Sequence, residues 1–215
     1  MKATLKLSTK ENKETIMNQK NLDLKTSNSS SKTKQLKLKN YIQSMNDETK
    51  FKFWIKTLIS SQSTIPEIIK AVDKIITIQA SSVSFASDIY NKNKSTYSQV
   101  EKVIDLTERK NSLVNIYVMT KEMTKSLTSE NYDFMERKFI YNWNVDDLAK
   151  YYNISARTVY RKTDKIINDI YTFCINNKWN LKFIEMQTKE EGWLKEKFIK
   201  LANDYFKNSN YKELS

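Results

Sequence analysis

The sequence predicts an all-α fold: a helical bundle in which a long helix leads into a C-terminal helix-turn-helix, with a disordered basic tail before it. Three observations predict this class. The 215 residues contain 1 Gly and 1 Pro, too few for the tight turns of a sheet-rich fold. From residue 47 onward, apolar residues recur at spacings of three and four, as on one face of a helix. The residues before that lack this period and are polar and basic.

The predicted tail covers residues 1–45 and consists mainly of Lys, Ser, Thr and Asn with isolated leucines. Ten lysines against three acidic residues give residues 1–46 a net charge of +7, out of +12 for the chain. Such a segment buries too little apolar surface to offset its chain entropy, so we expect disorder. The charge favours an arm that contacts phosphates without sequence preference, although a solvated linker would have the same composition.

A helical region is expected over residues 46–126. Its first helix spans residues 47–60, and the second starts near Pro66, a residue that the first turn of a helix tolerates well. We expect the second helix to end near residue 80, where a polar stretch from Ser81 to Ser98 begins. The inward residues predicted for the first helix are Phe51, Trp54, Ile55, Leu58 and Ile59.

A long helix is expected from about residue 97 to 125, with an imperfect apolar seam. The seam fits three arrangements: a two-helix coiled-coil arm, a handle for a homodimer through helix 97–125, and a plain helix packed on residues 47–80. The seam residues are Val100, Val103, Ile104, Leu106, Leu113, Val114, Tyr117 and Val118.

Residues 127–172 have the pattern of a helix-turn-helix domain. Thr128 is placed to cap a first helix with Met135, Phe139 and Ile140 inward. Asn144 is placed to cap a second, short helix that ends at Asn153, a residue type that tolerates the left-handed conformation. A third helix then runs from residue 156 to about 172, capped by Ser155. Its inward positions are Val159, Ile166, Ile167 and Ile170.

The outward face at the start of the third helix is basic, and this is where a recognition helix meets the major groove. Arginine can bind guanine through two hydrogen bonds, lysine and tyrosine can hold phosphates, and threonine can contact a thymine methyl group. The predicted DNA-binding residues are Ser155, Arg157, Thr158, Tyr160, Arg161, Lys162 and Lys165.

The remaining residues, 173–215, contain one predicted amphipathic helix, from about Lys189 to Asn208, which we expect to dock on the rest of the protein. The face assigned to it carries Leu194, Phe198, Leu201 and Tyr205.

Composition argues against catalysis. The chain has no His and a single cysteine, Cys174, so it lacks the groups of a Ser-His-Asp triad, a zinc finger or an iron–sulfur site. We therefore expect no catalytic residues, no metal and no cofactor. No apolar run approaches the roughly 18 residues that span a bilayer, which predicts a cytoplasmic protein without membrane contact.

The run VDDLAKYYNISARTVYRKTDKI, residues 145–166, resembles the helix-turn-helix of sigma-70 region 4 and, more closely, that of ArpU-type late transcriptional regulators of phages. The resemblance covers about residues 96–172, including a long charged helix before the motif. Asn142 and Asn153 stand where these families carry Gly, and asparagine keeps access to positive φ. The resemblance implies a regulator that binds double-stranded DNA and that has RNA polymerase as a candidate partner.

Three functions thus remain as alternatives. The leading one is a sequence-specific transcriptional regulator, either ArpU-like or a divergent sigma-like factor, although no convincing sigma region 2 is present. The second is a phage small terminase subunit or another DNA-packaging protein, which would assemble as a ring. The third is a helical interaction protein that does not bind DNA.

Overall fold

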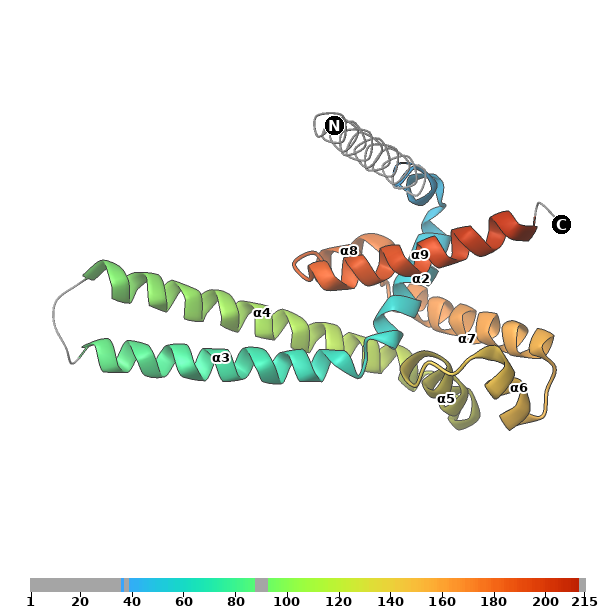
Figure 1. Ribbon diagram of the computed structural model, residues 1–215, viewed down its shortest axis with the longest axis horizontal. Helices are drawn as coiled ribbons and strands as arrows, with labels where there is room; N and C mark the ends of the chain where they lie inside the picture. Colours follow the sequence, from blue (N-terminus) through green and yellow to red (C-terminus); the bar gives the residue numbers. More distant parts are fainter. Residues whose placement is uncertain (1–35, 37–38, 88–92, 213–215) are drawn as a thin grey trace, which may run out of the picture. The chain divides into compact units, whose positions relative to one another are not determined.

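The structure, a computed structural model, describes residues 36, 39–87 and 93–212 (Figure 1). The described residues contain helices and no strand, which confirms the all-α class. They divide into two units, one of residues 46–204 and one of the described residues up to 45 and from 205 onward. The helices are α2 (Asp47–Ser60), α3 (Thr64–Ser87), α4 (Asn93–Lys125), α5 (Ser129–Met135), α6 (Val145–Tyr152), α7 (Ala156–Asn176), α8 (Leu181–Gln187) and α9 (Gly192–Lys212).

Helix α2 is the centre of the larger unit and packs against both α7 and α8. Asn46 caps it, its side chain accepting a hydrogen bond from the backbone N–H of Thr49 at 2.7 Å. The indole of Trp54 stacks on Phe198 of α9, with ring centroids 4.7 Å apart. The five inward residues predicted for this helix are all buried, with exposed fractions of 0–6%: Phe51, Trp54, Ile55, Leu58 and Ile59.

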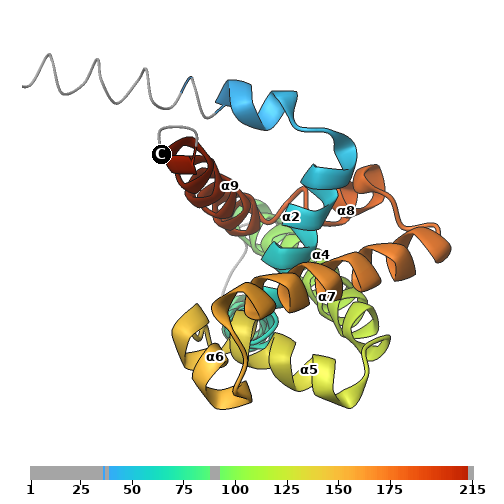
Figure 2. The same ribbon diagram turned by 90° about the vertical axis from the view of Figure 1, so that its right-hand side faces the viewer.

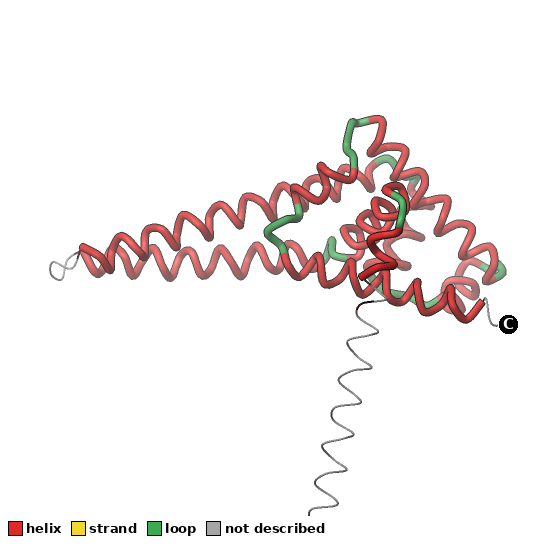
Figure 3. Tube along the Cα trace, turned by 90° about the horizontal axis from the view of Figure 1, so that it is seen from above, coloured by secondary structure: helices red, strands yellow, loops and turns green. Residues whose placement is uncertain are grey.

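Helices α3 and α4 form an antiparallel hairpin within one chain (Figure 3). Val72 and Leu113 are buried, and Lys110 pairs with Asp73 from one helix to the other. Helix α4 thus lies along α3 of the same chain, which fits both the two-helix arm and the helix packed on residues 47–80. The homodimer through helix 97–125 stays a prediction. The hairpin leaves part of the predicted seam exposed.

The predicted interruption from Ser81 to Ser98 was wrong over most of its length, because α3 continues to Ser87 and α4 begins at Asn93. Residues 88–92 lie outside the described part. Polar side chains in α3 bond to its own backbone: the Ser81 hydroxyl donates to the Thr77 carbonyl at 2.8 Å. A polar stretch without Gly or Pro is therefore compatible with a helix, because nothing in it removes a backbone hydrogen bond.

The C-terminal region contains two helices where one was predicted, α8 and α9, joined by a turn that carries Glu191. The Glu191 side chain is fully buried and accepts hydrogen bonds from Arg109 of α4 at 3.1 and 3.2 Å and from the Trp193 indole at 2.8 Å. The predicted inward face is confirmed for Leu194 and Phe198, whereas Tyr205 is 51% exposed.

The predicted disordered tail, residues 1–45, lies largely outside the described residues. Residues 39–44, however, are helical, so the tail was predicted too long. In the smaller unit the Tyr41 ring contacts that of Phe206, with centroids 4.6 Å apart. This ring contact buries apolar surface that the composition of the tail alone does not reveal.

Candidate nucleic-acid interface

Helix α5 begins as predicted but ends differently. The Thr128 hydroxyl accepts a hydrogen bond from the Asn131 backbone, and Met135 is fully buried. The next five residues, Glu136–Ile140, form a π-helical turn, which closes where the Tyr141 N–H donates to the Glu136 carbonyl at 3.0 Å. In this turn the predicted inward residues Phe139 and Ile140 are only half-buried.

Helix α6 follows the prediction closely. The Asn144 side chain accepts a hydrogen bond from the Asp147 N–H at 2.8 Å, and Leu148 is fully buried. The helix ends at Asn153, which has φ 51° and ψ 48°, the left-handed conformation predicted for it. The chain then turns at once, and the Ile154 N–H donates to the Ala149 carbonyl at 2.9 Å. Asn142, with φ 56°, ends the preceding segment in the same way.

Helix α7 leaves this turn under the cap of Ser155, whose hydroxyl accepts a hydrogen bond from the Thr158 N–H at 3.2 Å. Figure 2 shows α6 and α7 joined by this short connection, with α5 beside them. The predicted end near Thr172 was wrong, because α7 continues to Asn176 and buries Cys174. All four predicted inward residues are buried: Val159, Ile166, Ile167 and Ile170.

The first half of α7 presents cations to solvent. Arg157, Arg161 and Lys165 are exposed, and Tyr160 is 59% exposed. Within the described residues, none of these three cations forms an ion pair with a carboxylate. Because residues four apart on a helix lie on one face, they form a single basic surface, which we call the α7 basic face.

Lys162, which was predicted as a DNA contact, has partners inside the protein. Its ammonium group pairs with Glu130 of α5, and it lies 5.1 Å from the ring centroid of Phe134 and 5.3 Å from that of Tyr152. Its side chain is only 19% exposed. The hydrogen bond from Lys162, together with its charge, lowers the pKa of Glu130. Lys162 thus joins α7 to α5, a role that sequence position alone does not reveal.

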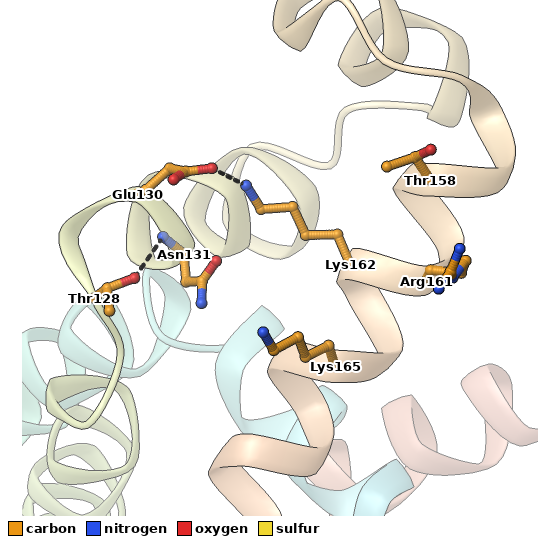
Figure 4. A pocket seen from close by; sticks show the side chains of 7 residues that line it. All are labelled: Thr128, Glu130, Asn131, Thr158, Arg161, Lys162 and Lys165. Carbon is orange, nitrogen blue, oxygen red and sulfur yellow. Dashed lines mark hydrogen bonds and ion pairs between the residues drawn. The ribbon is translucent and has the colours of Figure 1, made fainter.

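A hollow of about 750 Å³ lies between the start of α5 and α7 (Figure 4). The side chains of Lys162 and Lys165 extend from α7 towards α5, and Lys162 meets Glu130. The residues that line the hollow are Thr128, Glu130, Asn131, Thr158, Arg161, Lys162 and Lys165. Four of the seven predicted DNA-binding residues therefore line one concave surface. Ser155, Arg157 and Tyr160 do not.

A polar network that the sequence analysis missed supports the turn before α6. Asp133 accepts hydrogen bonds from Arg137 and from the Tyr152 hydroxyl. The Arg137 guanidinium lies 4.9 Å from the ring centroid of Trp143 and 4.1 Å from that of Tyr151. Burial and the bond to Asp133 raise the pKa of Tyr152 to about 12. The spacing of Asp133 and Arg137, four residues apart, is the signal that could have indicated this pair.

The described ranges contain no group of three or more His, Cys, Asp or Glu residues that could hold a metal ion. None of the helices described is long and apolar enough to cross a membrane. Comparison of the chain with protein-family models, with curated proteins and with solved structures finds no match.

Proposed function

We propose that this protein is a transcriptional regulator that binds double-stranded DNA sequence-specifically and reads the major groove with the first half of α7. The observation that carries the proposal is the α7 basic face, presented directly after a turn built from Asn153 and the Ser155 cap. A recognition helix needs a short, fixed connection to the helix before it and a solvent-facing N-terminal half. Both features are present.

The proposed contacts divide by position on α7. Arg157, in the first turn, enters the groove deepest and binds a base edge, for which a guanine offers two acceptors. Arg161, one turn later, reaches either a base or a flanking phosphate. Lys165 lines the hollow between α5 and α7, where a stretch of sugar-phosphate backbone would be held.

Lys162 is left out of the proposed contacts, because its charge is already paired with Glu130. The Ser155 hydroxyl is occupied by the cap of α7, and Thr158 contributes both its N–H and its hydroxyl to the same cap. These three residues therefore support the geometry of the proposed reading helix, while Arg157, Tyr160, Arg161 and Lys165 supply its contacts.

The regulatory role in this proposal derives from the resemblance of residues 145–166 to ArpU-type and sigma region 4 motifs. RNA polymerase is accordingly the proposed protein partner. A DNA-packaging subunit would use the same kind of motif, but it would assemble into a ring of many copies. A mass measurement on the DNA-bound protein separates these two functions.

The test begins with selection of bound sequences from random duplex DNA, followed by titration of the selected and a scrambled duplex at two salt concentrations. We expect Arg157→Ala to cost about 1–3 kcal/mol on the selected duplex and to relax the preference at one base position. Lys165→Ala should weaken both duplexes alike and lower the salt slope by about 0.9.

The matched control is Lys195→Ala, which removes an exposed lysine from α9. It should leave affinity and discrimination unchanged. If Arg157→Ala and Lys165→Ala behave like this control, the α7 basic face is only a solvated surface. A non-DNA-binding interaction protein is then the better description.

A further inference from the structure

Helix α4 carries a second apolar line that the hairpin does not use. It recurs at alternating spacings of three and four over residues 97–118, as the a and d positions of a heptad repeat do. The exposed fractions of its large apolar residues are 69% for Tyr97, 41% for Val100, 50% for Ile104, 37% for Val114 and 50% for Val118. Thr107 and Asn111, both exposed, complete the line. We call these seven residues the outer seam.

The outer seam is distinct from the line that contacts α3. That inner line contains Val103, Leu106 and Leu113, and it includes Lys110, which pairs with Asp73 of α3. On the opposite edge of α4 from the outer seam, Arg109 is held by the buried Glu191. The intrachain packing of α4 is therefore satisfied on two sides, and the outer seam faces away from both.

We propose that two copies of this chain pair through their outer seams, in parallel and in register at Asn111. A seam of coiled-coil spacing fits another helix with the same spacing, and a second α4 supplies one. The positions equivalent to Asn111 are Tyr97, Ile104 and Val118, and the last two are β-branched, as residues at the a positions of parallel two-stranded coiled coils are. One buried asparagine at such a position specifies register, because each amide finds its partner only in the other copy.

Charge favours the parallel orientation. In an antiparallel pair the same edges of the two helices meet, which would place Glu108, exposed and beside the outer seam, opposite Glu108 of the second copy. A parallel pair instead places Glu108 opposite the edge that carries Val103. Like charges directly opposite each other are destabilising, so the antiparallel pair has a cost that the parallel pair avoids.

The size of the seam indicates the strength of the pairing. Seven half-exposed side chains from each copy, with the edges beside them, bury on the order of 1,000 Å² in total. This is the lower limit for a specific interface, so we expect a dimer that dissociates on dilution. The pairing does not depend on the proposed function, although a parallel dimer would carry both α7 helices at the same end of the paired hairpins.

The experiment uses the full-length chain with single cysteines in the outer seam, Val100→Cys and Val118→Cys. Cys174 is fully buried and stays in place as an unreactive background. Under mild oxidation of the folded protein, each variant should form a disulfide with its own copy. In an equimolar mixture, no product should join position 100 to position 118, since these lie about 27 Å apart along a parallel pair. The control, Asp105→Cys, is exposed off the seam and should not cross-link.

Sedimentation equilibrium provides a second, independent readout. Ile104→Lys combined with Val118→Lys should raise the dimer dissociation constant at least tenfold without changing the circular dichroism, because both side chains lie on the exposed face of α4. Asn111→Val should strengthen the dimer and allow the mixed 100–118 product. The proposal is overturned if the mixed product dominates in the otherwise unchanged chain, or if the protein stays monomeric at concentrations of about 100 μM and no seam cysteine cross-links.

Discussion

The backbone at Asn153 offers a test of the turn between α6 and α7. Its φ of 51° and ψ of 48° lie in the region where a side chain other than Gly or Asn costs about 1–2 kcal/mol. The side chain is exposed, and none of the hydrogen bonds found among the described residues uses its carboxamide group, so substitution removes no side-chain hydrogen bond. We therefore expect Asn153→Ala to lose about 1 kcal/mol of unfolding free energy, Asn153→Val about 2, and Asn153→Gly about 0.

The assay is urea unfolding followed by circular dichroism at 222 nm, with thermal melts as a second measurement. For a unit of this size, 1 kcal/mol corresponds to about 2–4 °C in Tm. The matched control is Asn168, an exposed asparagine inside α7, where the change to Ala should stabilise by a few tenths of a kcal/mol because Ala is the better helix former. If Asn153→Gly is as destabilised as Asn153→Val, the loss comes from the asparagine side chain, and the backbone argument fails.

Three further predictions concern residues of α5 and α7. Lys162→Met should lower Tm by about 2–4 °C through loss of its ring contacts, whereas Lys165→Met, at an exposed position, should leave Tm unchanged. The hydrogen bond from Arg137 lowers the pKa of Asp133 below 3.8, so its contribution to stability is present above that pH and is lost as the pH falls through the lower, folded value. Asp133→Asn should accordingly destabilise the protein at pH 7 and flatten the loss of stability in acid, as measured by urea midpoints across pH. Burial raises the pKa of Cys174 to about 12, so a thiol reagent at pH 8 should label it only at the rate of unfolding, and fast labelling would contradict its burial.

The local features of the helix-turn-helix could be predicted from the sequence. Thr128, Asn144 and Ser155 each cap the helix expected of them, because a cap depends on a side chain and a backbone N–H two or three residues away. Asn142 and Asn153 take positive φ for an equally local reason. Whether the exposed residues of α7 contact DNA stays a prediction.

The features that sequence reasoning missed depend on distant residues. Glu130 and Lys162 are 32 positions apart, and their pairing follows from the way α5 packs beside α7. Glu191 is fully buried, because Arg109 reaches it from a helix 82 positions earlier. The end of α7 was missed for the same reason, since Cys174 has a buried environment only once α7 lies against the rest of the protein.

The uninterrupted length of α7 means that the helix-turn-helix is not a portable module. Helix α7 is about 32 Å long. The same helix carries the solvent-facing arginines and the residues that pack against α2. The ring of Tyr171 lies 5.4 Å from that of Phe51, centroid to centroid. A fragment that ends at residue 172 would truncate α7 and lose the buried Cys174. Any transplant of this motif to another scaffold must therefore carry α2 with it.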